Sequence, residues 1–578
     1  MSYQSTAVAD IAVSKRTASF ARGVNLAIFA IVALGAVLRI VQYAANPSLW
    51  LDEIALVKGI LALDFVGLFA RQLPFDQVAP KGFLFAQKLA VLAFGPSDYV
   101  LRFVPFMCSL VALVAFSRFA QRALSPVGAL VATLLFATAA PFIAFAGIVK
   151  QYSVDVCVAV VLSWLALDLI TRPVTEPKAW RAAIAGAILQ WFSQPAVLMV
   201  GALACPVVLW VSTDPPDARR RRVAIVLALW GASALAVTAA TLATMSPETR
   251  DYMRAYWADG FVPASLARVV ELRWPWPNIR LLFGFGAQAA LAYPLSPLYP
   301  ALAVIGLGIL WVRQRRVALI VLAPLVVTLG AAFARQYPFS DRLILFLVPS
   351  LMIAIAAVSA AVYGFVERFS KPAALLAVVG LTVPAVVPVA RLRPPYRVED
   401  MKYVLGQIQA RRQPTDTVYV YYGAAPAMSV YDSTFGYSRG AYAVGGCHRG
   451  DSRGYLEELD TFRGDPRVWV VLTHSLFVYR EREDILAYLD TIGTRMDYVS
   501  IPSRAVGRNP LPAEGFLFDL SAAPRLARAD AGSFKLTGPN AVNHGDDCAN
   551  GVQAMIRSDF ACTGPPRTRC TRRPLAGS

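Results

Sequence analysis

The sequence carries little charge for its length. Only 16% of its 578 residues are charged, whereas a soluble protein carries about 25%. Hydrophobic residues make up 57% of the chain, and the mean hydropathy is +0.52. They arrive in blocks of roughly 15–20 residues, near the length that crosses the hydrocarbon core of a bilayer. This composition argues against a soluble fold and predicts a polytopic membrane protein.

Histidine and cysteine are also scarce. All three histidines lie in the C-terminal polar region, at His448, His474 and His544, so histidine is not an obvious base elsewhere in the chain. The seven cysteines lack the spacing of a zinc site. Three lie in apolar blocks, and four lie in the C-terminal region: Cys447, Cys548, Cys562 and Cys570. If that region is extracytoplasmic, these four allow two disulfides in three pairings.

The net charge of +18 would suggest nucleic-acid binding in a soluble protein. Here much of the arginine and lysine lies in short loops between apolar blocks, which is the pattern of cytoplasmic loops in membrane proteins. No nucleic-acid partner is therefore expected. The basic residues instead predict which side of the membrane each loop occupies.

The apolar blocks predict about eleven spans, at 24–43, 103–120, 125–145, 152–171, 181–194, 196–213, 223–243, 297–313, 317–334, 343–363 and 373–391. Basic residues precede the first span and no small-residue cleavage site follows it, which predicts an uncleaved signal anchor with residues 1–23 in the cytoplasm. Nearly every dense basic cluster in a short loop then falls on the cytoplasmic side. This orientation requires segment 81–94 to lie in the membrane interface rather than cross.

The predicted fold class is mainly α, with a transmembrane helix bundle over 24–392. Its long first extracytoplasmic loop covers 44–102. A smaller extracytoplasmic α/β domain follows over 393–528, with helices at 398–412 and 481–493 and strands at 417–422 and 467–473. The tail, 529–578, is polar and is expected to be loose unless disulfides tie it.

The first candidate site is the sequence Pro47-Ser48-Leu49-Trp50-Leu51-Asp52-Glu53, just beyond the first span. Two adjacent acids in an apolar setting are costly to desolvate, which indicates function. Acids also favour the N-terminus of a helix, so a simple helix cap explains the pair equally well. The local sequence leaves both interpretations open.

Three other segments place charge at the predicted outer boundary. Lys81 begins the interfacial segment and suits either phosphate binding or snorkelling, as do Arg39 and Arg102. Lys150 and Asp155 flank Gln151 and Tyr152 at the start of a span, either as a site or as an ion pair that fixes packing. Tyr337 and Arg342 precede another span, where the arginine suits a phosphate clamp or an interface anchor.

The predicted topology places Asp52, Glu53, Lys81, Lys150 and Arg342 on one side of the membrane. A carboxylate can deprotonate an acceptor hydroxyl. A phosphate leaving group needs no general acid, but its charge must be stabilised by cations. This combination suits transfer from a lipid-phosphate donor.

The Leu49–Glu53 motif resembles the Asp-Glu motif of the GT-C glycosyltransferases, in the branch of the protein mannosyltransferases and bacterial aminoarabinose transferases. The stretches 79–84 and 95–102 are similar to the sequence that follows this motif in the family. The stretches 150–153 and 337–342 look like patterns of a bacterial subgroup. The resemblance covers about residues 20–365. This sequence lacks the Glu-Lys-Pro motif of the aminoarabinose transferases. Pro80, Lys81 and Gly82 stand at that place instead.

The resemblance implies a polyprenyl-phosphate-sugar donor, a lipid, glycan or protein acceptor, and an inverting single displacement at the outer face of a bacterial inner membrane. Asp52 matches the catalytic carboxylate, and Glu53 would position the acceptor or support Asp52. The donor phosphate would be held by Lys81, Lys150, Arg342 and Arg102. Substrate contacts are expected from Trp50, Gln151, Tyr152 and Tyr337. No metal ligand set is spelled out, although a divalent cation is compatible with the acidic pair.

Two other functions remain open from the sequence. A transporter or flippase of a lipid-linked substrate predicts charges along a path near mid-membrane, and only Asp155 fits that pattern. A non-catalytic envelope scaffold predicts that the C-terminal domain binds a partner and that the acidic pair has no chemical role.

Overall fold

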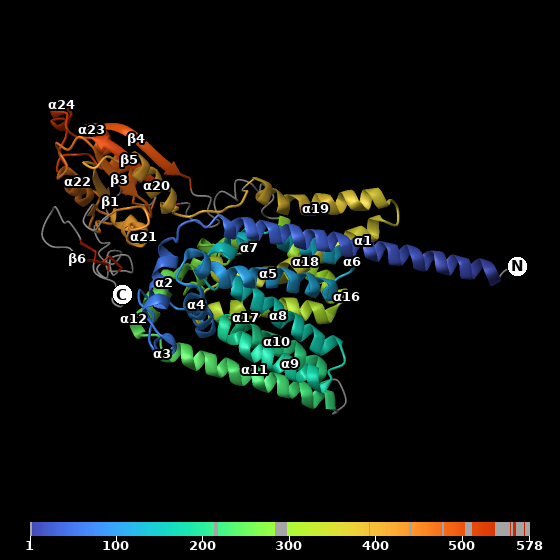
Figure 1. Ribbon diagram of the computed structural model, residues 1–578. Helices are drawn as coiled ribbons and strands as arrows, with labels where there is room; N and C mark the ends of the chain where they lie inside the picture. Colours follow the sequence, from blue (N-terminus) through green and yellow to red (C-terminus); the bar gives the residue numbers. More distant parts are fainter. Residues whose placement is uncertain are drawn as a thin grey trace. The chain divides into compact units, whose positions relative to one another are not determined.

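The computed structural model describes residues 3–212, 218–283, 298–391, 393–437, 442–476, 479–502, 511–537, 555–556, 559–561 and 571–572. The chain forms two compact units (Figure 1). The first comprises Met1–Ala45, Leu63–Gln72 and Val78–Pro395, and the second comprises Asn46–Ala62, Leu73–Gln77 and Tyr396–Ser578.

The first unit is helical. Its longer helices are α1 (Tyr3–Ala44), α4 (Lys81–Phe94), α5 (Asp98–Ala123), α6 (Pro126–Thr138), α8 (Tyr152–Thr171), α9 (Glu176–Leu189), α10 (Ala196–Val211), α11 (Ala218–Ala243), α12 (Pro247–Tyr256), α16 (Leu298–Arg313), α17 (Arg315–Phe333), α18 (Val348–Val366) and α19 (Lys371–Arg391). Its short elements are α3 (Phe65–Ala70), α7 (Ala140–Ala144), η1 (Phe145–Gly147), η2 (Gln190–Phe192), η3 (Ala258–Gly260), α13 (Leu266–Glu271), α14 (Trp276–Phe283) and η4 (Asp341–Leu347).

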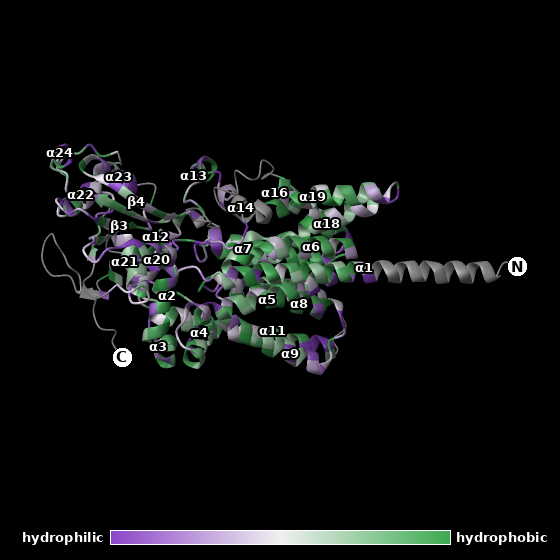
Figure 2. Ribbon diagram, turned by 45° about the horizontal axis from the view of Figure 1, so that its top comes forward, coloured by the Kyte–Doolittle hydropathy of each residue, from purple (hydrophilic) through white to green (hydrophobic). Residues whose placement is uncertain are grey.

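Six helices among the described residues are long and apolar enough to span a membrane, or seven if the bent pair formed by α6 and α7 is one span. The helices α10, α16 and the first part of α19 are apolar but shorter. Each of the predicted spans overlaps one of these helices, the bent pair or α9. In the bundle, α5 packs on α8, α6 on α18, and α9 on α11, and the helices are hydrophobic over most of their length (Figure 2). The protein is therefore a multi-pass membrane protein.

Arg39 shows how the bundle accommodates a charge in its first span. Its side chain is fully buried, and the guanidinium donates to Ser109 Oγ at 2.9 Å and to the carbonyl of Ala137 at 3.1 Å. Ala137 lies just before the break where α6 and α7 are bent by 53°. A break leaves carbonyl groups without partners in the helix, and inside a membrane these must be satisfied by other groups. Arg39 therefore stabilises a bent span.

The second unit contains a five-stranded sheet with helices. Its helices are α2 (Leu51–Ala62), α20 (Met401–Arg411), η5 (Tyr422–Ala424), α21 (Ala425–Tyr431), α22 (Ser452–Asp460), α23 (Glu481–Ile492) and α24 (Ala523–Leu526). The sheet has the order β2 (Ala443–Val444), β1 (Thr417–Val420), β3 (Val468–Leu472), β5 (Ala513–Asp519) and β4 (Thr494–Ile501). The strands β2, β1 and β3 are parallel, with Tyr419 opposite Val470, whereas β5 is antiparallel to both β3 and β4. A separate pair joins β6 (Phe560–Ala561) and β7 (Thr571–Arg572).

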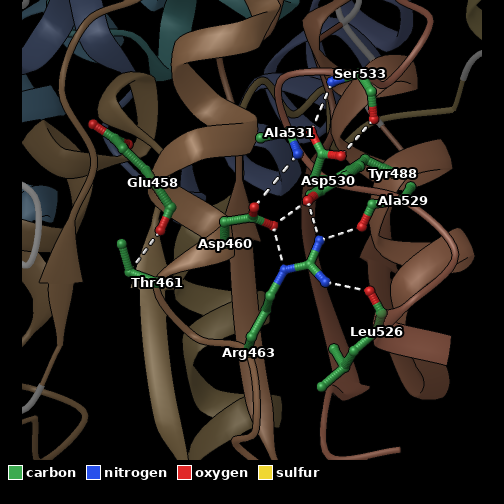
Figure 3. A network of polar contacts seen from close by, with 10 residues as sticks. All are labelled: Glu458, Asp460, Thr461, Arg463, Tyr488, Leu526, Ala529, Asp530, Ala531 and Ser533. Atoms are coloured by element: carbon green, nitrogen blue, oxygen red, sulfur yellow. Dashed lines mark hydrogen bonds and ion pairs between the residues drawn. The ribbon is translucent and has the colours of Figure 1, made fainter. Parts of the chain in front are cut away.

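Both predicted strands and both predicted helices of this domain are present, and the fold class is confirmed. Cys447 is disulfide-bonded, whereas Cys548, Cys562 and Cys570 lie outside the described residues. The segment after β5 is tied back to the helices through Arg463 (Figure 3). The Arg463 guanidinium contacts Asp460 at 2.8 Å and Tyr488 at 2.7 Å, and it also donates to the carbonyls of Leu526 and Ala529.

Candidate active site

The predicted site residues fall into two groups, one in each compact unit. Trp50, Asp52 and Glu53 belong to the second unit, and the remaining predicted residues belong to the first. The acidic motif follows Asn46, whose backbone is left-handed (φ 41°). Asparagine is among the few residues that adopt this conformation readily.

Ser48 is held by the segment that precedes α20. Its backbone N–H and its hydroxyl both donate to Asp400 Oδ1 at 2.9 Å, and its Oγ accepts from the backbone N–H of Lys402 at 2.6 Å. Lys402 Nζ also donates to the carbonyl of Asn46 at 2.9 Å. Ser48 and Asp400 are both buried, at 2% and 4% exposed. The loop therefore has one defined backbone conformation where it approaches the two acids.

The next residues are fixed in the same way. The backbone N–H of Leu49 donates to the phenolic oxygen of Tyr431 at 2.7 Å, and that of Leu51 donates to Glu399 Oε2 at 3.4 Å. The other oxygen of Glu399 contacts His474 Nδ1 at 2.7 Å. Glu399 and His474 both have left-handed backbones (φ 49° and 55°), a conformation that costs a non-glycine residue about 1 kcal/mol. The strain is offset by the contacts that these two residues make.

Asp52 and Glu53 occupy different positions in the first turn of α2. Glu53 is 1% exposed, and its Oε2 accepts the backbone N–H of Trp50 at 3.2 Å. This is the reciprocal bond of a capping box, in which a glutamate at the third helical position satisfies the N-cap amide. Asp52 is partly exposed. Glu53 is thus explained as a helix cap. Asp52 is the acid of the pair that remains a candidate for a chemical role.

In the first unit, Arg342 lies against the start of α8. Its Nε donates to the hydroxyl of Tyr152 at 2.8 Å, and its guanidinium lies 5.1 Å from the ring centre of Trp257. An ion pair with Asp341 at 3.7 Å adds to these contacts. Tyr337 lies beside Tyr152 and donates to the carbonyl of Leu343 at 2.8 Å. Three predicted residues, Tyr152, Tyr337 and Arg342, are therefore brought together.

A set of buried polar groups surrounds Asp155. This residue is 7% exposed and lies beside Tyr337 and Ser193. The Asp155 carboxylate is close enough to the Ser193 hydroxyl to interact with it, whereas Ser153 Oγ and Gln151 Oε1 have no hydrogen-bond partner among the described residues. Buried polar atoms in native proteins nearly always have partners, so such a set indicates a place for water or a bound ligand. The Asp155 and Gln151 oxygens only accept hydrogen bonds, whereas the two serine hydroxyls can also donate.

Ser193 was not predicted as a site residue. The sequence contains a signal for it, because the polar run Gln190-Trp191-Phe192-Ser193-Gln194-Pro195 interrupts two apolar blocks. In the structure, α9 passes into η2 there, and Ser193 follows η2 directly. Trp257 was not predicted as a site residue either, yet its ring packs on Arg342.

The remaining predicted cations are buried. Lys81 begins α4, is 8% exposed and donates to the carbonyl of Leu68 at 3.1 Å. Burial lowers the pKa of Lys81. Arg102 is 1% exposed in α5 and lies near Tyr43, and Lys150 is 6% exposed just before α8. Among the described residues, no group of three or more histidine, cysteine or acidic side chains has the arrangement of a metal site.

The two ends of α8 differ in charge environment. At its C-terminal end, Arg219 donates to the carbonyl of Leu169 and Arg222 to that of Val174, both at 2.9 Å. At its N-terminal end lie Tyr152 and Arg342. A helix of 20 residues is about 30 Å long, so these groups lie a membrane thickness apart. Arg219 and Arg222 thus lie at the end of the bundle opposite to Arg342.

No family model and no curated protein matches the sequence. Among solved structures, the chain is similar to the oligosaccharyltransferase AglB from Archaeoglobus fulgidus in complex with an inhibitory peptide and a dolichol-phosphate. The identity is 11%, the match covers 82% of this chain and 73% of that chain, and the TM-score is 0.43. It is also similar to ArnT from Cupriavidus metallidurans bound to undecaprenyl phosphate, at 12% identity, 86% and 98% coverage and a TM-score of 0.43. Both structural neighbours are GT-C family members, the family that the motifs resemble.

Proposed function

We propose that the protein is a membrane glycosyltransferase that transfers a sugar from a polyprenyl-phosphate-linked donor to a cell-envelope acceptor. The observation that carries this proposal is the division between the two acids. The carboxylate of Glu53 caps its own helix, whereas Asp52, one position earlier in the first turn of α2, is partly exposed and follows a loop of fixed conformation.

In this reaction Asp52 takes the proton of an acceptor hydroxyl. The acceptor oxygen attacks the anomeric carbon of the sugar as the bond from that carbon to the phosphate oxygen breaks. The electron pair of that bond leaves with the polyprenyl phosphate, and the configuration at the anomeric carbon inverts. Such a general base contributes about 10²–10⁴-fold to the rate.

Arg342 and Lys150 hold the donor phosphate in this proposal, with Lys81 and Arg102 as further cations. The contacts of Arg342 support its assignment, because a guanidinium placed between a tyrosine hydroxyl and a tryptophan ring is pre-oriented for planar recognition of a phosphate. Gln151, Tyr152 and Tyr337 contact the sugar, together with the buried acceptor atoms around Asp155. Trp50 lines the acceptor side.

We place the reaction at the extracytoplasmic face of a bacterial inner membrane, with the N-terminus in the cytoplasm. This orientation is supported by the arginines at the C-terminal end of α8, since the positive-inside rule puts them in the cytoplasm. The C-terminal α/β domain is then extracytoplasmic, where the disulfide at Cys447 is stable.

The proposal is tested by comparing polyprenyl-linked sugars and envelope glycans in cells with and without the protein. Loss of the protein should accumulate one lipid-linked sugar and remove that sugar from one envelope component. Complementation with Asp52→Asn should leave both changes in place. Unchanged lipid-linked sugars and glycans would contradict the proposal. Movement of the lipid across vesicles without any transfer would instead support a flippase.

A further inference from the structure

Four successive backbone amides at the acidic motif each donate to a side-chain oxygen. The N–H groups of Ser48, Leu49, Trp50 and Leu51 donate to Asp400, Tyr431, Glu53 and Glu399, respectively. Amides at the start of a helix have no partner within the helix and must find one elsewhere. Three of the four partners here come from residues 399–431, some 350 positions along the chain. The C-terminal domain therefore holds the loop that leads into α2 and accepts the first amide of that helix.

A second contact fixes the same helix farther along. Lys58 forms an ion pair with Asp559, and Asp559 Oδ2 also accepts the hydroxyl of Ser429 at 2.8 Å. Ser429 lies in α21, the helix on which α2 packs and which ends at Tyr431. The helix α2 is thus held at its N-terminus and in its second half by groups of one α/β domain.

We propose that the C-terminal domain is a positioning device for Asp52, with Tyr431, Asp400 and Glu399 as positioning residues. This inference rests on the proposed function, because it assumes that Asp52 is the base. In this proposal the C-terminal domain contributes to catalysis by fixing the position of Asp52, without binding a ligand itself. None of the three residues takes or gives a proton in the reaction; each acts through the backbone of residues 48–51.

Backbone position matters here because aspartate has a short side chain. Its carboxylate moves with the first turn of α2 and cannot compensate for a displaced backbone as a lysine or glutamate can. A displacement of about 1 Å at a reacting group can cost about 10²-fold in rate. Residues 46–62 contain no cysteine, so no disulfide fixes this turn, and the hydrogen bonds to Asp400, Tyr431 and Glu399 hold its backbone.

The first test compares two tyrosine variants. Tyr431→Phe removes the acceptor for the Leu49 amide, and Tyr442→Phe is the matched control. Both tyrosines are 4% exposed, but the hydroxyl of Tyr442 donates to Asp432 Oδ2 at 3.0 Å. Using the full-length protein and the lipid-linked sugar from cells that lack it, we expect Tyr431→Phe to lower kcat by about 10- to 100-fold at an unchanged donor KM. Tyr442→Phe should keep the wild-type kcat.

The second test varies Asp400. Asp400→Ala removes the acceptor for Ser48 and should lower kcat, whereas Asp400→Asn keeps an oxygen at the same place and should restore most of it. Equal losses in both variants would contradict a positioning role. Asp52→Asn separates the two proposals. If this variant is as active as the wild type, the proposed function itself is wrong. If Asp52→Asn is inactive while Tyr431→Phe and Asp400→Ala keep the wild-type kcat, only the positioning is wrong.

A third test needs no substrate. Hydrogen–deuterium exchange of residues 46–51 in the full-length protein reports directly on the four amides. We expect exchange at Leu49 to be roughly tenfold faster in Tyr431→Phe than in the wild type and unchanged in Tyr442→Phe, because an opened amide exchanges in proportion to its opening. Equal exchange in all three proteins would overturn the proposal.

Discussion

Asp400 Oδ1 accepts both the backbone N–H and the hydroxyl of Ser48, each at 2.9 Å, across 352 positions of the chain. This relationship makes the acidic motif part of the C-terminal domain rather than a loop of the membrane bundle. The other oxygen of Asp400 is bound by Arg397 at 3.0 Å. Arg397 therefore helps to hold the Asp400 carboxylate in the position where it accepts from Ser48.

Glu53 should matter for stability in a way that Asp52 does not. Glu53→Ala removes the oxygen that accepts the Trp50 amide, and loss of such a cap costs about 1 kcal/mol. Glu53→Gln keeps an oxygen there and should cost much less. Thermal unfolding of the purified protein should rank the variants in that order. Asp52→Asn should unfold at the wild-type temperature, and a lower temperature would show that Asp52 also has a structural role.

Arg342→Lys should weaken donor binding. Lysine cannot donate to Tyr152 and at the same time present a flat cation to the ring of Trp257. We expect the donor KM to rise by about tenfold, the loss expected for one good charge-assisted contact. The matched control is Arg335→Lys, because Arg335 is exposed and lies over the ring of Phe261. If both variants change the donor KM equally, Arg342 has no specific role.

Asp155→Asn should separate activity from stability. The Asp155 carboxylate is buried, so removing its charge should not lower the unfolding temperature. Transfer should nevertheless fall, because the site loses its strongest acceptor. Asp168→Asn, at the opposite end of α8, should lose only its contacts with Arg122 and Arg172 and retain transfer. A destabilised and fully active Asp155→Asn would contradict this account.

His448 should make the stability of the C-terminal domain depend on pH. Burial lowers the pKa of His448, but the adjacent Glu458 carboxylate at 2.9 Å outweighs it, and the net pKa is raised. The folded state therefore binds the proton more tightly than the unfolded state. The resulting stability is fully present below about pH 6.5, the ordinary histidine value, and is lost as pH rises through the raised pKa.

The measurement is the unfolding temperature of the wild type and of His448→Gln between pH 5 and pH 9. The difference between the two proteins should be largest at the acidic end and should shrink as pH rises. A difference that grows with pH would mean that His448 is held in its neutral form.

Much of the bundle could be predicted because each span is a long apolar run, and every predicted span overlaps a helix or a bent pair. The break between α6 and α7 was not predicted, although Pro141 in the first turn of α7 is a sequence signal for it. The strands β4 and β5 were also missed. The strand β4 is largely exposed and polar, as in Thr494, Arg495 and Asp497, and lacks the apolar run that marked β3.

The candidate site was predicted only in part. The acidic motif and Arg342 stood out because charges near apolar runs are rare. The partners of Ser48 and Leu49 could not be predicted, because Asp400 and Tyr431 lie far away in the sequence and come beside them only in the folded chain. Ser193 was missed for a similar reason. Ser193 becomes a candidate only because it lies beside Asp155, which belongs to the distant helix α8.

The central claim is that Asp52 is the base of a lipid-phosphate-dependent sugar transfer. The most direct measurement adds purified protein to membranes from cells that lack it, which contain both the accumulated lipid-linked sugar and the acceptor. The wild type should consume the lipid-linked sugar and release polyprenyl phosphate in equal amount. Asp52→Asn, with the same unfolding temperature, should be at least about 10²-fold slower. Consumption by Asp52→Asn at the wild-type rate would contradict the account.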